Sequence, residues 1–561
     1  MTDEVKNVWK VSPLRKPVML AACFAGGTLY AAALPPLNWS FAIIISLLPV
    51  LYCAGKSSWK FSALCGWCWG LGWALFAYQF LREIEWFVPY LLAPVIAIWP
   101  GVWAALLPGI WHTALFPEPL AVAKCSDRAA YLKNDLPPWR VFIAALVSAA
   151  MFTLVEWTRS RLFVWNDFSV TQWRNSAVIQ IAALTGSYGI GFLLALINTA
   201  VYSAVVYRRK AVVTVIFTSV LTAAAAGYGF WRIAGFENLP PPEKRVRAGL
   251  IQCDLTQRRH ATANEVYEAV DVCTALSEKC AALKPEFIIW PESAVPIPLQ
   301  SGGAEGDYFR RKFAALLRST GTPLLAGMLA FRQSTGSNEW RITNSAVLFT
   351  PEGRAAARYD KIHRVPYGEY VPFRKYLPEF ITRAMDMGRD LEPGTDFDPV
   401  TLKEGVKASI AICYEGVFGY LMREFAGRGS DLFIVISNDA WYPRSSEPEQ
   451  HLANAVIRCV ETGLPMIRCS NNGGSGVVTP LGKFTRYIGS SADRPELLRE
   501  RAYGVVEVAI YSGRKATLFV RWGEYFIAIL AAIAAVFGVY ALLYRTKVNE
   551  KIFKSIRKED K

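Results

Sequence analysis

At 561 residues the chain is long enough for more than one folded unit. Its 53% hydrophobic and 19% charged residues favour a membrane protein, but they exclude a chain made only of membrane spans. The net charge of +15 would suit a nucleic-acid-binding protein. Much of that charge lies in short clusters beside apolar stretches, which is typical of cytoplasmic flanks that face anionic lipid, so we expect no nucleic-acid partner.

Eight apolar stretches predict transmembrane helices, because a bilayer core needs about 20 residues per helix. They are Val18–Leu34, Ser40–Ala54, Phe61–Leu81, Leu91–Phe116, Val141–Trp157, Ile179–Val206, Ala211–Trp231 and Tyr525–Leu543. Seven precede a stretch of mixed composition and one follows it. We therefore expect an N-terminal bundle (residues 1–238), a soluble domain (239–521), and a C-terminal helix with a basic tail (522–561).

Lysine and arginine gather on every second loop between these stretches, as the positive-inside rule requires. The N-terminus with Lys6 and Lys10, the loop Arg208–Lys210 and the C-terminal tail all fall on one side. Both termini are therefore expected in the cytoplasm and the soluble domain outside. A cleaved signal peptide ending at Ala31–Ala33 is the alternative, but a Pro-rich turn there leads straight into a second apolar stretch.

The soluble domain alternates short apolar runs with helical periodicity, which predicts a layered α/β fold. The expected strands are Ala248–Cys253, Phe287–Trp290, Leu324–Met328, Ala346–Phe349, Ser409–Cys413, Leu432–Ser437, Met466–Cys469 and Val505–Ile510. The expected helices are Asn264–Leu283, Tyr308–Arg318 and Gln450–Thr462. In such folds reactive side chains gather where strands end.

Three side chains at such positions could cooperate in chemistry. Glu292 follows the buried run Phe287–Trp290, although a surface glutamate in a turn fits that segment equally well. Cys413 ends another run; a buried cysteine alone is usually a small hydrophobic residue. Lys361 lies in a predicted structured loop, Arg358–Phe373, and taken alone it is most simply a surface lysine. A thiol of pKa about 8.5 needs a base and a nearby cation to attack, and these two residues supply them.

The three motifs taken together resemble those of a known superfamily. Trp290-Pro291-Glu292, Tyr359-Asp360-Lys361 and Cys413-Tyr414-Glu415, in this order, are similar to the Glu–Lys–Cys motifs of the nitrilase superfamily. Seven spans before such a domain and one after it resemble the bacterial apolipoprotein N-acyltransferases. Further similar segments are Val365–Pro372, Ser437–Trp441 and Asn471–Gly473, so the likeness covers nearly the whole chain.

The resemblance implies a membrane helical bundle of eight transmembrane helices joined to a nitrilase-like αββα sandwich. It also implies ping-pong acyl transfer with Glu292, Lys361 and Cys413 as the catalytic triad. A phospholipid would donate the acyl chain to Cys413, and a diacylglyceryl-cysteine lipoprotein would accept it on its N-terminal amine. The implied supporting and substrate-binding residues are Glu369, Tyr414, Glu415, Asn438 and Trp441. The implied location is the bacterial cytoplasmic membrane, with the domain on its periplasmic face and among membrane lipids.

No metal or other cofactor is expected. His112, His260, His363 and His451 are too scattered to suggest zinc, and the cysteines lack paired ligand spacing. Cys65 and Cys68 fit a Cys-x-x-Cys pattern but lie in an apolar stretch, where packing is the better interpretation. Two other functions stay open: a membrane-anchored amidase with the same triad, and a transporter or lipid-binding protein with a degenerate domain.

Overall fold

The structure is a computed structural model that describes residues 15–117, 125–258, 261–333, 339–376, 378–379, 390–442, 445–490, 499–511 and 515–559. The chain divides into two compact units. The helical unit comprises the described residues up to Ile233 and those from Glu524 onward, and the α/β unit runs from Ala234 to Gly523. Lys6 and Lys10, which the sequence assigns to a cytoplasmic flank, lie outside the described residues.

The helical unit has a helix in each of the eight predicted apolar stretches. Its α-helices are α2 (Lys16–Ala33), α3 (Ile43–Ser46), α4 (Leu48–Ala54), α5 (Trp59–Ala77), α6 (Val88–Ile96), α7 (Ile98–Leu115), α9 (Cys125–Asn134), α10 (Pro138–Ser160), α11 (Ser176–Ile179), α12 (Ala182–Thr185), α13 (Ser187–Tyr207), α14 (Val212–Glu237) and α21 (Tyr525–Glu559). The end of α14 extends into the α/β unit.

Within the described residues, four helical stretches are long and apolar enough to cross a membrane. They are Val88–Leu115, Pro138–Ser160, Ser187–Glu237 and Tyr525–Lys551. The stretch Ser187–Glu237 is not one continuous helix, because the backbone at Arg208 has a φ of 50° and separates α13 from α14. The number of eight spans is therefore not confirmed and stays a prediction.

Helices α2 and α5 coincide with two predicted spans but are not among the four stretches. They pack closely through small residues, as membrane helices commonly do. A methyl group on Gly27 would lie 1.9 Å from the carbonyl oxygen of Trp69, so only glycine fits there. Tyr30 stacks on Trp73 with ring centroids 4.8 Å apart. This contact joins the two helices through buried aromatic rings.

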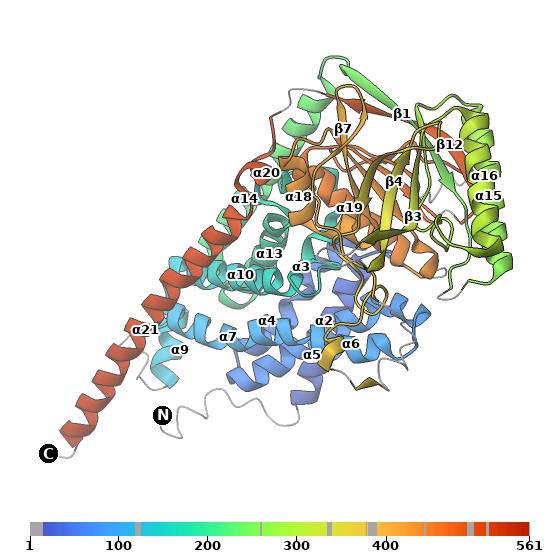
Figure 1. Cartoon of the computed structure of the whole chain (residues 1–561). Coiled ribbons are helices and arrows are strands. Elements are labelled where there is room, and N and C mark those ends of the chain that lie inside the picture. The colour runs from blue at the N-terminus through green and yellow to red at the C-terminus, as the bar shows by residue number, and fades with distance from the viewer. Residues whose placement is uncertain are drawn as a thin grey trace. The chain divides into compact units, whose positions relative to one another are not determined.

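Two six-stranded sheets form the centre of the α/β unit (Figure 1). The first has the order β12 (Ala502–Ile510), β1 (Lys244–Gln252), β2 (Phe287–Ile289), β3 (Leu324–Gln333), β4 (Trp340–Phe349), β5 (Ala355–Asp360). The second has the order β11 (Phe484–Thr485), β10 (Gly476–Val478), β9 (Met466–Ser470), β8 (Leu432–Ser437), β7 (Val406–Ile412), β6 (Val400–Lys403). The central strands β1 to β3 and β7 to β9 run parallel, and antiparallel strands flank them.

The two sheets pack face to face. The sulfur of Cys469 on β9 lies 3.3 Å from the carbonyl oxygen of Ile251 on β1 and 3.4 Å from that of Ile289 on β2. Helices α15 (Ala263–Ala281) and α16 (Gly303–Thr320) cover the first sheet, and α18 (Gly419–Gly427) and α19 (Glu447–Thr462) pack against the second (Figure 1). The predicted αββα sandwich is confirmed.

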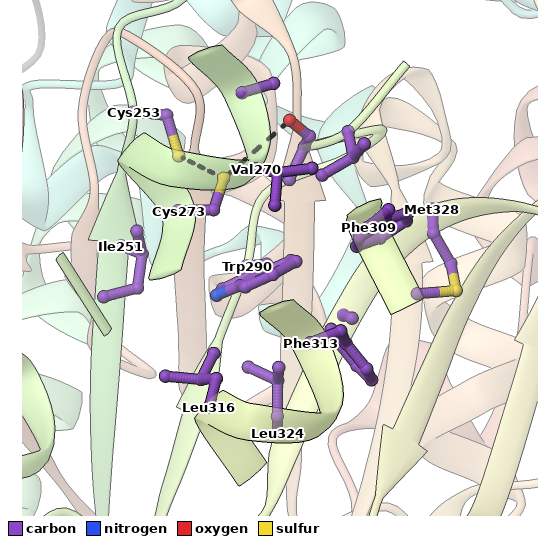
Figure 2. Packing of buried hydrophobic residues seen from close by; sticks show 14 of the residues in the cluster. Ile251, Cys253, Val270, Cys273, Trp290, Phe309, Phe313, Leu316, Leu324 and Met328 are labelled. Carbon is purple, nitrogen blue, oxygen red and sulfur yellow. Dashed lines mark hydrogen bonds between the residues drawn. The ribbon is translucent and has the colours of Figure 1, made fainter. Parts of the chain in front are cut away.

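A hydrophobic cluster fills the space between the first sheet and its two helices (Figure 2). Trp290 packs edge to face on Phe313 of α16, with ring centroids 5.6 Å apart. Its indole N–H donates to the hydroxyl of Ser277 on α15 at 2.8 Å. A buried indole needs such a partner, and this one fixes the residue two positions before Glu292.

The segment that carries Lys361 differs from the prediction of a loop throughout Arg358–Phe373. Arg358, Tyr359 and Asp360 belong to β5, which pairs antiparallel with β4 at the edge of the first sheet. Its sequence, Ala355–Asp360, has no β-branched residue and carries charge, so it lacks the usual pattern of a strand. An edge position tolerates this composition because one side of the strand remains unpaired.

Replacing Gly327 on β3 with alanine should destabilise the α/β unit. The added methyl group would lie 2.1 Å from the carbonyl oxygen of Pro291 and 2.8 Å from the side chain of Ile436. Overpacking of this kind costs about 1–3 kcal/mol, so thermal unfolding in detergent should show a Tm about 5 °C lower. Gly427→Ala is the matched control, because nothing lies within 4 Å of its new methyl group. Equal melting temperatures for the two variants would contradict this packing.

Candidate active site

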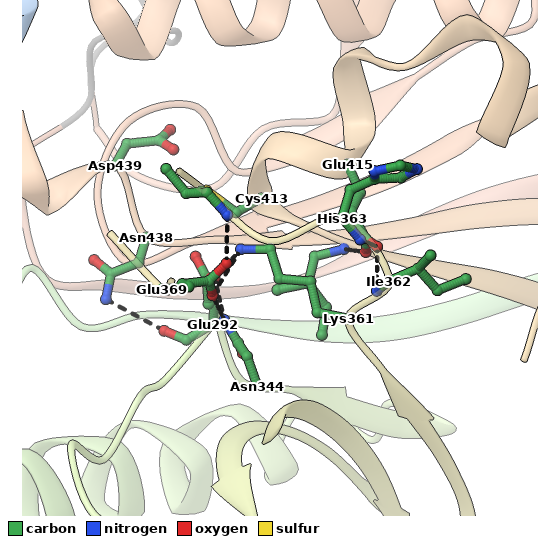
Figure 3. A network of polar contacts seen from close by, with 12 residues as sticks. Glu292, Asn344, Lys361, Ile362, His363, Glu369, Cys413, Glu415, Asn438 and Asp439 are labelled. Carbon is green, nitrogen blue, oxygen red and sulfur yellow. Dashed lines mark hydrogen bonds and ion pairs between the residues drawn. The ribbon is translucent and has the colours of Figure 1, made fainter. Parts of the chain in front are cut away.

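The predicted reactive side chains lie at strand ends of the α/β unit (Figure 3). Glu292 follows β2, Lys361 follows β5 and Cys413 follows β7. Glu292 and Lys361 are buried, with 6% and 1% of their surface exposed, whereas Cys413 is partly exposed. The first sheet therefore carries the carboxylate and the ammonium, and the second sheet carries the thiol.

Lys361 forms two ion pairs at the centre of the site. Its Nζ lies 3.0 Å from Oε1 of Glu292 and 3.1 Å from Oε1 of Glu369. Burial disfavours the charged ammonium, but the negative charges of the two carboxylates outweigh it and raise the pKa of Lys361 well above its ordinary value. Lys361 is therefore a permanent cation here. Glu369, expected to support the site, contacts the lysine directly.

Asn344 on β4 is a residue of this site that the sequence did not reveal. Its side-chain N–H₂ donates to Oε1 of Glu292 at 2.6 Å and to Oε1 of Glu369 at 2.7 Å. The amide thus bridges the same two carboxylate oxygens that Lys361 bridges. Asn344 lies just before the expected strand Ala346–Phe349, so the sequence did not single it out. Its contacts with Glu292 and Glu369 form only because β4 pairs with β5 in this register.

Cys413 has an unfavourable backbone conformation that surrounding contacts must stabilise. Its φ is 54°, in the left-handed region that costs a residue with a Cβ about 1–2 kcal/mol, and it begins the short 3₁₀ helix η7 (Cys413–Val417). Burial and the charge of Glu292 raise the pKa of the Cys413 thiol well above its ordinary value, although Lys361 opposes them. The resting sulfur is therefore a thiol.

A buried polar chain from α19 holds the carbonyl of Cys413. The Nε2 of His451 lies 3.0 Å from that oxygen, which can only accept, so Nε2 donates. The Nδ1 of His451 lies 3.0 Å from Oδ1 of Asp439, and Arg468 pairs with the same carboxylate. Burial opposes ionisation of Asp439, but the charges of Arg468 and His451 lower its pKa to about 2. His451 was not expected here, because the histidines were considered only as zinc ligands. Asp439 lies in the similar segment Ser437–Trp441 but had no predicted role, and Arg468 was not predicted at all.

Glu415 ties the Lys361 segment to the end of β7. Its carboxylate accepts from the backbone N–H groups of Ile362, His363 and Ile412 at 2.7 to 2.9 Å. The hydroxyl of Tyr359 donates to both of its oxygens at 2.9 Å. Burial raises the pKa of Glu415 to about 7, against these hydrogen bonds and the charge of Lys361. Glu415 thus connects the segments that carry Lys361 and Cys413.

The remaining expected site residues have different surroundings. Asn438 is buried; it donates to the backbone oxygen of Glu292 at 3.3 Å and accepts from Asn471 at 3.0 Å. Tyr414 is partly exposed and packs edge to face on Phe418 at 4.9 Å. Trp441, with 39% of its surface exposed, is the most open of the group. Asn438 therefore positions Glu292, whereas Tyr414 and Trp441 lie nearer to solvent.

Among the described residues, two groups of side chains have the ligand atoms for a metal. The atoms of Cys413, Asp439 and His451 lie within 4.8 Å of one another, as do the sulfurs of Cys23, Cys53 and Cys65. In the first group both nitrogens of His451 already contact oxygen acceptors. A metal there would have to break the contacts that hold Cys413. His260 lies outside the described residues, and the expectation of no metal stays a prediction.

Two family models match the chain. The model of carbon-nitrogen hydrolases covers residues 247–493, and that of the N-terminal domain of apolipoprotein N-acyltransferases covers residues 26–200. An apolipoprotein N-acyltransferase of Geobacter metallireducens is 32% identical over 69% of this chain and 71% of its own length. One of Rhizobium leguminosarum bv. trifolii is 29% identical over 88% of this chain and 92% of its own.

Among solved structures, an amidase from Nesterenkonia sp. is 18% identical, with a TM-score of 0.32. The match covers 52% of this chain and 97% of the amidase. The α/β sandwich and the matching family model place the α/β unit among the carbon-nitrogen hydrolases of the nitrilase superfamily. Its relatives and its helical unit specify the branch: the chain belongs to the apolipoprotein N-acyltransferase family.

Folding stability should depend on pH through Glu415. Because its pKa rises from 4.5 to about 7 on folding, the folded protein binds more protons than the unfolded chain between these values. The stabilisation is fully present below pH 4.5 and is lost as the pH rises through 7. Between pH 5 and 7 the unfolding free energy should fall by about 2 kcal/mol through this group.

Denaturant unfolding in detergent at pH 5 and pH 7 measures this difference. Glu415→Gln should remove about 2 kcal/mol of the pH dependence, whatever its effect on absolute stability. The exposed Glu404→Gln is the control and should keep the pH dependence of the unmodified protein. If the unfolding free energy of Glu415→Gln changed between pH 5 and pH 7 as much as that of the unmodified protein, the raised pKa of Glu415 would be contradicted.

Proposed function

We propose that the protein transfers an acyl chain from a phospholipid, through a thioester on Cys413, to the N-terminal amine of a diacylglyceryl-cysteine lipoprotein. The observation that carries the proposal is the buried Lys361–Glu292 ion pair at the strand ends where a strained cysteine begins η7. Membership of the family supports lipoprotein N-acylation as the overall reaction.

In the first half-reaction, Cys413 attacks the ester carbonyl of the phospholipid. Because the resting sulfur is a thiol, Glu292 takes its proton as the carbon–sulfur bond forms. The oxygen of the tetrahedral intermediate becomes negative, and the Lys361 ammonium with nearby backbone N–H groups stabilises it. The intermediate then expels the lysophospholipid oxygen, which takes the proton from Glu292. The acyl chain remains on sulfur as a thioester.

In the second half-reaction, the lipoprotein amine attacks the thioester carbon. Glu292 takes a proton from the attacking nitrogen and returns it to the departing sulfur, which restores the Cys413 thiol. The product is an amide. A thioester is activated toward amines, so no nucleotide or other cofactor is needed. Glu369 holds Lys361 and Asn438 positions Glu292. Tyr414 and Glu415 support the nucleophile, and Trp441 borders the substrate.

Both substrates are lipids, which accounts for a catalytic domain fused to apolar helices. Apolar stretches such as Tyr525–Lys551 would anchor the chain in the bacterial cytoplasmic membrane. Both termini would lie in the cytoplasm and the α/β unit on the outer, periplasmic face. The diacylglyceryl group and the phospholipid would then reach the site from the membrane.

A labelled acyl chain should become attached to Cys413. Purified protein in detergent is incubated with a phospholipid labelled in its acyl chain, quenched in acid and analysed as peptides. Label should be absent in Cys413→Ser, and Lys361→Met should form the acyl-enzyme about 10²-fold more slowly because it lacks the oxyanion's cation. Cys68→Ser, a change at another partly exposed cysteine, should label normally.

Two results would contradict this function. One is label that persists in Cys413→Ser. The other is release of ammonia from small amides without any lipid adduct, which would favour the amidase.

The orientation can be tested with a cysteine placed on the α/β unit. Ser319 is exposed on α16, so Ser319→Cys offers a reactive thiol without disturbing the core. A membrane-impermeant maleimide should label residue 319 in intact spheroplasts as fully as after lysis. Peptide mass spectrometry distinguishes this label from labels on native cysteines. Labelling only after lysis would place the α/β unit in the cytoplasm.

A further inference from the structure

Two cysteines of the α/β unit lie in unusually close contact behind Glu292. The sulfurs of Cys253, just after β1, and Cys273, on α15, are 3.2 Å apart, and both residues are fully buried (Figure 2). Non-bonded carbon atoms pack at about 3.5–4.0 Å, and sulfur is the larger atom. The two residues are free thiols in the structure, because a disulfide is about 2.05 Å long, but a small movement of the side chains would bring the sulfurs to that distance.

The other cysteines of the described α/β unit have different surroundings. The thiol of Cys280 faces the backbone oxygen of Gly504 at 3.7 Å, and that of Cys469 faces Ile251 at 3.3 Å. Cys459 lies buried on α19. These residues are small hydrophobic groups in a core, and they provide controls for the pair.

We propose that Cys253 and Cys273 are joined by a disulfide in the mature protein. The inference rests on the outward orientation proposed above, because outer compartments are oxidising and sustain such bonds. The oxidant is a protein disulfide acting by thiol–disulfide exchange. One cysteine thiolate attacks it and forms a mixed disulfide, and the other displaces the oxidant's second sulfur. The Cys253–Cys273 bond forms, two protons are released, and the oxidant leaves reduced by two electrons as a dithiolate.

Because both sulfurs are buried in the folded protein, the disulfide can form only at an early stage. Once folded, both thiols are inaccessible, and the contact with Cys273 together with burial raises the pKa of Cys253 well above its ordinary value. Cys253 would then not react as a thiolate, and an external oxidant would reach neither sulfur. The exchange therefore takes place during folding, before α15 closes over the end of β1. After that the bond is protected from reductants.

The bond would fix both flanks of Glu292. On the β1 side, the backbone of Asp254 donates to the carbonyl of Asn471 at 2.7 Å, and Asn471 in turn donates to Asn438 at 3.0 Å. Asn438 donates to the backbone of Glu292. On the α15 side, Cys273 contacts the backbone oxygen of Ala294 at 3.8 Å, two residues beyond Glu292. A disulfide would thus restrain the segments on both sides of Glu292, the proposed general base.

Differential alkylation of the full-length chain tests the bond. Membranes are quenched in acid, free thiols are blocked with N-ethylmaleimide in denaturant, and the protein is then reduced and treated with iodoacetamide. Peptides containing Cys253 and Cys273 should carry the iodoacetamide label, and those containing Cys280, Cys459 and Cys469 the maleimide. Maleimide on Cys253 and Cys273 would overturn the inference.

Variants give a second readout. Cys253→Ala and Cys273→Ala should each lower the Tm by about 5–10 °C, because either change removes the same cross-link. Adding a reductant to the unfolding assay should lower the Tm of the unmodified protein and leave that of the double variant unchanged, whereas two packed thiols would make both melting temperatures insensitive to the reductant and would overturn the bond. Neither readout uses acyl transfer. Failure of the acyl-enzyme or spheroplast experiments would therefore be recognised separately from failure of the disulfide.

Discussion

A lysine ammonium with 1% of its surface exposed is the constraint around which the site is organised. Removing such a charge from water costs several kcal/mol unless opposite charges and hydrogen bonds replace the solvent. Glu292 and Glu369 supply the charges, and Asn344 gives both carboxylates a further donor. All four residues come from strands of the first sheet or from the segments that follow β2 and β5. The ammonium of Lys361 is therefore fully paired by groups of the first sheet alone.

Cys413, the proposed nucleophile, comes from the other sheet and is held by contacts of its own. Cys413 holds a left-handed backbone because His451 binds its carbonyl oxygen and Glu415 binds the N–H of the residue before it. Glu415 also binds the backbone just after Lys361, so one buried carboxylate spans from the first sheet to the second. The base and cation therefore meet the thiol only when the two sheets pack together. Closure of the sandwich and assembly of the site are one event.

The sequence predicts those features that depend on local pattern. Leu432–Ser437 is a strand with the expected ends, because six consecutive buried apolar or small residues can hardly be anything else in this fold. Glu292, Lys361 and Cys413 were found from motif order and resemblance. Asn344 and His451 were missed because their roles arise from contacts with residues 52 and 38 positions away. Strand β5 was missed because an edge strand needs neither burial nor alternation.

The burial of these side chains also suggests how a fold shared with hydrolases would carry out the proposed acyl transfer. Water must not reach the thioester before the amine does, so the groups that activate a nucleophile should be shielded from solvent. Here Glu292 and Lys361 are buried and already bonded to each other, while Cys413 alone is partly exposed. In the proposed reaction Glu292 would take a proton from any nucleophile that reaches the thioester, so selectivity would depend on what occupies the entrance at Cys413. An acceptor that carries lipid chains would fill that entrance and displace water, which would tie deacylation to the arrival of the acceptor.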